Sequence, residues 1–128
     1  MILDSSAVIA VMLREPGFDV LVGKLSLPIA KGIGAPTLGE IGLVLTAKLN
    51  RDPRGLIKRF LDEVDVETVA FGDEHWPIAL EAYERFGKGR HRAGLNFGDC
   101  LTYAVAKLAQ QPLLFVGTDF SKTDLQPA

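Results

Sequence analysis

The chain has 128 residues, of which 48% are hydrophobic and 23% charged, and this fits one folded domain spanning residues 1–128 with a sizeable core. Its net charge of −2 excludes a polycationic nucleic-acid-binding protein, so any contact with nucleic acid must use a local basic patch. The single cysteine, Cys100, excludes an intramolecular disulfide and fits a reducing cytoplasm. No apolar run approaches the ~20 residues that a membrane-spanning helix needs, so we expect no membrane segment.

In the first half of the chain, short apolar runs alternate with amphipathic segments. Asp4, Ser5 and Ser6 follow an apolar run and carry the side-chain oxygens typical of a helix N-terminus. Pro16 and Gly17 mark a turn after the first helix. The predicted elements are a strand at 1–3, helices at 7–13 and 18–27, a Gly-broken strand at 29–35 and a helix at 37–49.

The second half continues the same alternation. Pro53 after Asp52 predicts a helix start, and the apolar residues that follow repeat at helical spacing as far as Val64. Asp73 is predicted to cap a helix that ends near 86, before a basic loop, GKGRHRAG, at 87–94. A strand at 66–71, a helix at 97–110 and a strand at 113–116 complete the pattern. The sequence therefore predicts an α/β fold with a mainly parallel sheet.

Four acidic residues stand just after an apolar strand or in the first turns of the helix that follows. They are Asp4, Glu40, Asp99 and Asp119. Strand ends and helix starts meet at one edge of an open α/β sheet, so acids far apart in sequence are expected to converge there. Carboxylates that crowd together repel one another, and a divalent cation that prefers oxygen ligands relieves the repulsion.

The acids also have purely structural explanations. Asp4 could cap the first helix, and Thr37 with Glu40 has the spacing of a capping box. Asn96 and Asp99 have the same spacing at the start of a later helix. The four acids together favour a metal site. Helix N-termini repel cations, so a cation binds at this edge only where several carboxylates outweigh the helix dipoles, and four carboxylates meet that requirement.

The ligand set determines the chemistry. Only oxygen ligands are available, which suits Mg²⁺ or Mn²⁺ and argues against structural zinc. A Mg²⁺ site keeps water molecules and takes phosphate oxygens as ligands, so a phosphodiester is the natural substrate class. Either one or two bound metal ions could support hydrolysis of a phosphodiester at this site. Ser6 is predicted to hold Asp4 from the second coordination shell, and Thr118 to do the same for Asp119. Contact with phosphates is predicted for three residues of the basic loop: Lys88, Arg90 and Arg92.

These residues resemble a known family. The segments MILDSSAVIAVML, APTLGE, LNFGDCLTYAVAKL and PLLFVGTDFSKTDL look like a PIN-domain ribonuclease, and more closely like the VapC-type toxins of toxin–antitoxin pairs. The resemblance covers nearly the whole chain and implies one PIN-like domain, a three-layer α/β/α sandwich with about four or five mainly parallel strands. It implies an endoribonuclease dependent on Mg²⁺ or Mn²⁺ that cuts structured RNA such as tRNA or rRNA.

By position, the four acids match the acidic quartet of that family. The resemblance implies that Asp4 and Asp99 are the principal metal ligands, that Glu40 completes the site, and that Asp119 acts directly or through water. It also implies a cognate VapB-type antitoxin, a toxin homodimer and a cytoplasmic location.

Two other classes stay open on the sequence alone. A receiver-type phosphoacceptor domain shares the size and an acidic Mg²⁺ pocket, but it would need paired acids after the first strand, where serines follow Asp4. A PIN-like domain that binds RNA or protein without cutting would be expected to lack one of the acids, and none is missing.

Overall fold

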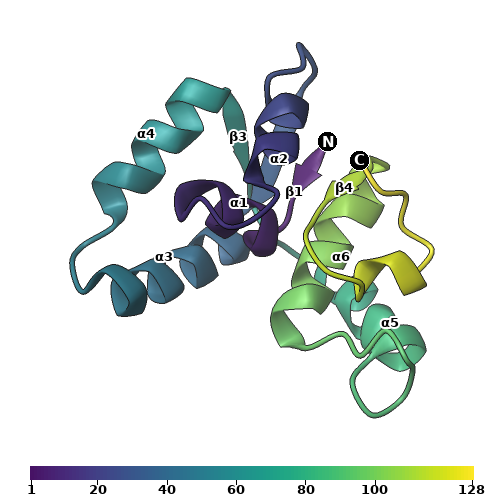
Figure 1. Ribbon diagram of the computed structural model, residues 1–128. Coiled ribbons are helices and arrows are strands. Elements are labelled where there is room, and N and C mark those ends of the chain that lie inside the picture. Colours follow the sequence, from purple (N-terminus) through teal and green to yellow (C-terminus); the bar gives the residue numbers. More distant parts are fainter.

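The sheet has four strands, and helices cover both of its faces (Figure 1). The structure is a computed structural model that describes all residues, 1–128. The strand order is β3-β2-β1-β4, and every neighbouring pair is parallel. The strands are β1 (Ile2–Leu3), β2 (Lys31–Gly34), β3 (Val66–Val69) and β4 (Leu113–Leu114). The predicted α/β/α architecture is confirmed, with four strands.

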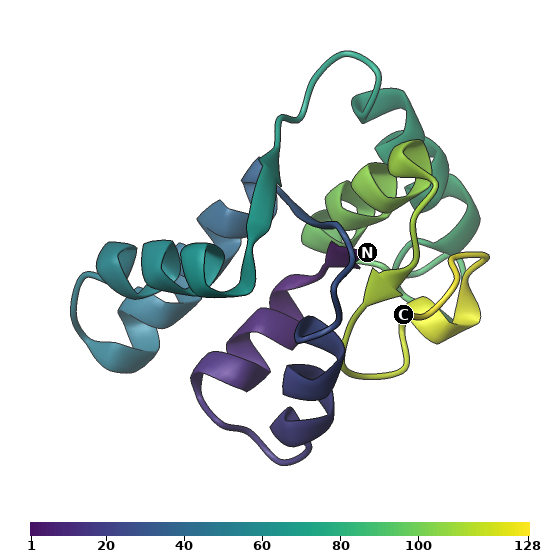
Figure 2. The same ribbon diagram turned by 90° about the horizontal axis from the view of Figure 1, so that it is seen from above.

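Six α-helices and one short 3₁₀ helix connect and cover the strands. They are α1 (Ser5–Met12), α2 (Phe18–Leu25), α3 (Ala35–Leu49), α4 (Arg54–Val64), α5 (Trp76–Phe86), α6 (Phe97–Ala109) and η1 (Phe120–Lys122). α5 and α6 pack together on one side of the molecule, α3 also packs against α6, and α4 projects away from α5 and α6 (Figure 2). None of these helices has the length and apolar character needed to cross a membrane.

Alternation along the short strands divides the core between the two faces of the sheet. Ile2 and Leu113 belong to the cluster that packs with α5 and α6, whereas Leu3 and Leu114 belong to the cluster that packs with α1, α2 and α3. Successive side chains of a strand point to opposite faces, so two residues per strand are enough to anchor both layers. This explains how strands as short as β1 and β4 hold the sheet together.

β1 occupies an inner position, and its end fixes the edge where the candidate site lies. Ile2 pairs with Gly32 of β2 and with Leu113 of β4, and the Asp4 amide donates to the Leu114 carbonyl (2.9 Å). Because the strands are parallel, the segments that follow β1, β2 and β4 leave the sheet at the same edge.

Two predicted helix starts are wrong in their capping residues. The helix predicted at 37–49 begins at Ala35, so Thr37 is already inside it and forms no capping box with Glu40. Asp73 does not cap α5, which begins at Trp76. In both helices a proline lies in the first turn, where its fixed φ and missing N–H favour a helix start over any side-chain cap nearby.

Candidate active site

Asp4 is held rigidly at the end of β1. Its side chain is buried and caps α1, accepting hydrogen bonds from the Ser6 amide (3.0 Å) and the Ser6 hydroxyl (2.5 Å). The same Ser6 oxygen accepts a hydrogen bond from the Val116 amide (3.0 Å). Ser6 therefore connects Asp4 to the segment that follows β4, and its hydroxyl holds the Asp4 carboxylate in one orientation, as predicted.

Asp99 is the third residue of α6 and forms a capping box with Asn96, the residue that caps the helix. Its carboxylate accepts from the Asn96 amide (3.1 Å), and its own amide donates to the Asn96 side chain (2.9 Å). Burial is the main cause that raises the pKa of Asp99 to about 6, against the opposing hydrogen bond from Asn96. Repulsion from the three other acids, Asp4, Asp119 and Glu40, raises this pKa further. The carboxylates of Asp4, Asp119 and Glu40 thus each lie within electrostatic range of Asp99.

Glu40 approaches the start of α6 from the second turn of α3. A Cβ atom placed on Gly98 would collide with a Glu40 carboxylate oxygen, so any larger residue there would make the end of the Glu40 side chain move from its place beside Asp99. Thr37 and Thr102 form a buried hydroxyl pair between the same two helices, with 3.2 Å between their oxygens. The α3–α6 contact therefore brings Glu40 to Asp99.

Asp119 is exposed in the loop after β4, immediately before η1, and its side chain caps nothing there. No hydrogen bond joins the Thr118 hydroxyl to Asp119; instead the Thr118 carbonyl accepts from the Ser121 hydroxyl (2.5 Å). The predicted support of Asp119 by Thr118 is therefore not formed in the structure.

None of the four acids has a cationic partner. The ion pairs of the protein lie elsewhere, at Asp52, Glu81 and Asp124. No three acidic, histidine or cysteine side chains are arranged as an assembled metal site. The four carboxylates supply only oxygen donors and negative charge without a balancing cation, and this donor set fits a hard divalent ion such as Mg²⁺ or Mn²⁺.

The basic loop between α5 and α6 exposes all three residues predicted to contact RNA: Lys88, Arg90 and Arg92. The Arg90 guanidinium lies over the Tyr83 ring, 5.3 Å from its centre. His91 has a structural position, because its Nδ1 accepts from the Ala93 amide (3.0 Å) and its ring meets Phe86 edge-on.

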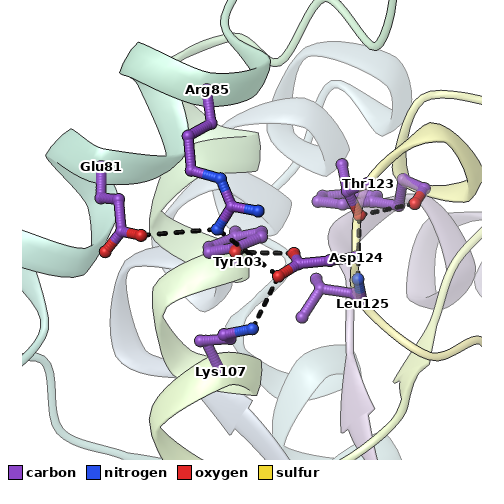
Figure 3. Close-up of polar contacts among 8 residues, drawn as sticks. Glu81, Arg85, Tyr103, Lys107, Thr123, Asp124 and Leu125 are labelled. Atoms are coloured by element: carbon purple, nitrogen blue, oxygen red, sulfur yellow. Dashed lines mark hydrogen bonds and ion pairs between the residues drawn. The ribbon is translucent and has the colours of Figure 1, made fainter.

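A polar network around Asp124 ties the segment after η1 to α5 and α6 (Figure 3). Asp124 accepts from the Tyr103 hydroxyl (2.7 Å) and Lys107 (2.7 Å), and Arg85 lies 3.5 Å from it. Burial alone would raise the pKa of Asp124, but the hydrogen bonds from Lys107 and Tyr103 outweigh it and lower the pKa. The network anchors the chain just beyond the loop that carries Asp119.

Sequence reasoning missed Gly98 and the pair of threonines, Thr37 and Thr102. Gly98 could have been noticed, because glycine is unfavourable inside a helix and its position next to Asp99 requires a reason such as close approach. The threonine pair joins residues 65 positions apart, and no local pattern in the sequence indicates it.

The fold and the acidic edge define an α/β nuclease-like domain, and comparison with known proteins makes the class specific. A model of the PIN domain family matches residues 1–125. A VapC ribonuclease of Mycobacterium bovis and ribonuclease VapC36 of Mycobacterium tuberculosis are each 43% identical over 127 residues, covering 98% of this chain and 91% of the relative. A ribonuclease VapC of Mycolicibacterium smegmatis is 36% identical, covering 98% of this chain and 97% of the relative.

Two solved structures share the fold at 17% identity. One is Mycobacterium tuberculosis VapC20, a sarcin–ricin loop cleaving toxin, with a TM-score of 0.77 over 99% of this chain and 97% of the other. The second is a toxin–antitoxin complex from Klebsiella pneumoniae, with a TM-score of 0.70 over 96% of this chain and 92% of the other. The chain belongs to the PIN domain family and, within it, to the VapC ribonucleases.

Proposed function

We propose that this protein is a metal-dependent endoribonuclease that acts as the toxin of a toxin–antitoxin pair and inhibits growth by cutting RNA. The observation that carries the proposal is the set of four carboxylates, without a cationic partner, at the sheet edge of a VapC-family chain. The substrate class that fits is RNA, with tRNA or rRNA as the structured targets. A single PIN-like domain over residues 1–128 and a cytoplasmic location complete the proposal.

We assign the metal site to the acidic quartet. Asp4 and Asp99 are the proposed principal ligands of Mg²⁺ or Mn²⁺, Glu40 completes the site, and Asp119 acts directly or through water. When bound, the ion polarises water and phosphate oxygens, which is the chemistry that phosphodiester hydrolysis requires. The chain's own contribution is orientation: Ser6 fixes the Asp4 carboxylate, and the Asn96 amide fixes that of Asp99.

The proposed RNA contacts lie on the loop between α5 and α6. Lys88, Arg90 and Arg92 are exposed and carry the local positive charge that an overall acidic protein needs for phosphate binding. The Arg90–Tyr83 contact holds one of these charges against α5. Their removal should weaken RNA binding without affecting the metal ligands.

The proposed partners are a VapB-type antitoxin and a second copy of the chain. Large apolar side chains are exposed along α5 and at the start of α6, and they line a groove of about 700 Å³. The most exposed are Trp76 (57%), Leu80 (53%) and Phe97 (81%). Exposed apolar patches of this kind mark protein contacts, so this face is our candidate for the homodimer contact.

The test is cleavage of total cellular RNA by purified protein free of antitoxin, with Mg²⁺, with Mn²⁺ and with EDTA. We expect discrete fragments that disappear with EDTA and with Asp99→Asn. Asp73→Asn, which removes an exposed acid outside the site, is the matched control and should cut as the wild type does. Cleavage by Asp99→Asn at the wild-type rate would show that the roles are assigned wrongly. No cleavage of RNA known to contain tRNA and rRNA would favour a non-catalytic binding domain.

A further inference from the structure

We propose that Thr37 and Thr102 are positioning residues, whose buried hydroxyl pair sets the distance between the carboxylates of Glu40 and Asp99. This inference rests on the proposed function, because it assigns to two non-acidic residues a role in shaping the metal site. The hydroxyl oxygens lie 3.2 Å apart, and the residues are 4% and 1% exposed.

The pair lies in register with both acids. Thr37 precedes Glu40 by three residues on α3, and Thr102 follows Asp99 by three residues on α6. Residues three apart on a helix share a face, so each hydroxyl stands one turn from a carboxylate on the side where the two helices meet. A displacement of one helix at the threonine pair is therefore passed directly to the acid on the same face.

The backbones of this region approach closely, and small residues permit it. A Cβ atom on Gly34, just before α3, would lie 3.0 Å from a methyl carbon of Val105 and 3.5 Å from the Thr37 hydroxyl. At the other end of the contact, Gly98 makes room for Glu40. No other hydrogen bond joins α3 to α6, so this hydroxyl pair is the only polar link across the contact.

The pairing is specific, because a helical threonine has a local alternative. Thr46, on the same helix, bonds its hydroxyl to the Gly42 carbonyl one turn earlier (2.7 Å). Thr37 and Thr102 make no such bond and use their hydroxyls across the helix contact instead. The cross-helix bond holds oxygens at 3.2 Å, whereas two carbon atoms in the same place would need ~3.5–4.0 Å. Loss of the hydroxyls should therefore separate the helices by roughly 0.5 Å, which equals the tolerance of a functional site.

The experiment compares wild type with Thr37→Val/Thr102→Val, which removes both hydroxyls but keeps the branched shape, and with Thr37→Ser/Thr102→Ser, which keeps both hydroxyls. Mn²⁺ affinity is measured from the electron paramagnetic resonance signal of free Mn²⁺, and urea unfolding is measured in EDTA. We expect about tenfold weaker Mn²⁺ binding in the valine pair, the size typical of lost second-shell support. The serine pair should bind within about twofold of wild type. Unfolding should change little, because replacing both partners of a buried hydrogen bond is nearly neutral.

Wild-type affinity in the valine pair would overturn the inference, and so would an equal loss in the serine pair, which would mean that packing and not hydrogen bonding matters. If the valine pair fails to fold, Thr37→Ala/Thr102→Ala removes both hydroxyls without added bulk. No bond then fixes the helix spacing, so Mn²⁺ binding weaker than in the serine pair is expected, and wild-type affinity in the alanine pair would overturn the inference. Wild-type protein that binds Mn²⁺ no better than Asp99→Asn does would overturn the proposed metal site itself, a result distinguishable from failure of the positioning role alone.

Discussion

Ser6→Ala should destabilise the protein more than any other removal of a single hydroxyl group near the site. The Ser6 oxygen donates to the Asp4 carboxylate (2.5 Å) and accepts from the Val116 amide (3.0 Å), so one atom joins β1, α1 and the segment after β4. The substitution removes both bonds and leaves a buried carboxylate with one protein donor fewer.

The magnitude follows from the two bonds. A hydrogen bond to a charged group contributes roughly 1.5–3 kcal/mol and a neutral one roughly 0.5–1.5 kcal/mol. The Val116 amide is near solvent and recovers part of its bond from water, and alanine gains up to about 0.5 kcal/mol in helix propensity over serine. We therefore expect a loss of about 2 kcal/mol in the free energy of unfolding, or roughly 8 °C in Tm for a domain of this size.

Urea and thermal unfolding measured by circular dichroism are the assays, and Ser5→Ala is the matched control. Ser5 neighbours Ser6 in the first turn of α1, but its side chain makes no hydrogen bond. The gain in helix propensity is common to both variants, so their difference isolates the two bonds of Ser6. Equal stability of Ser5→Ala and Ser6→Ala would refute the reasoning. RNA cleavage by Ser6→Ala should also fall by about 10–100-fold, as expected for loss of second-shell support.

Four further predictions concern the site and the segments that support it. Burial raises the pKa of Asp99 to about 6, so ionisation of this carboxyl opposes folding. In EDTA, Asp99→Asn should therefore gain about 1 kcal/mol in the free energy of unfolding over wild type, after solvent screening, as pH rises from about 4 to about 6. Urea titrations across that range measure this gain, and a difference between the two proteins that does not depend on pH would contradict the prediction. Metal affinity of the wild type should fall below about pH 6, where Asp99 becomes protonated, and Mn²⁺ titration measures this. Gly98→Ala should displace Glu40 and lower cleavage at least about tenfold, while α6 gains up to about 1 kcal/mol in helix propensity, so wild-type activity would count against the role of Glu40. Tyr103→Phe should cost about 1–2 kcal/mol in urea unfolding at pH 7 because Asp124 loses a donor, and unchanged stability would argue that Lys107 suffices.

Much of the fold can be predicted from the spacing of apolar residues along the sequence. The four strands fall inside the predicted segments, and every predicted helix is present, because apolar periodicity marks which face each element buries. The errors are at helix starts. The predicted Thr37 and Asp73 caps are wrong because α3 begins at Ala35 and α5 at Trp76, and the prolines that follow, Pro36 and Pro77, favour those starts over a nearby side-chain cap.

The residues of the proposed site can be named from the sequence, but the contacts that hold them cannot. Parallel-sheet topology was enough to expect Asp4, Glu40, Asp99 and Asp119 at one edge, since the rule depends on strand ends alone. The hydrogen bonds that hold these acids in place are harder to predict from the sequence. The Ser6 contact with Asp4 is local and could be predicted, whereas its bond to Val116 crosses 110 residues and depends on the pairing of β1 with β4.

The inner position of β1 has a consequence for the timing of synthesis. Asp4 is translated more than a hundred residues before Leu114 and Val116, which supply the hydrogen-bond partners of its amide and of its supporting serine. Domains fold as units during synthesis, and contacts between distant parts of the chain form late. The acidic edge therefore stays incomplete until residues 113–119 have been made. For a chain of the VapC ribonucleases, this order of assembly means that the proposed metal site is still unfinished while most of the chain is being translated beside the RNA of its own ribosome.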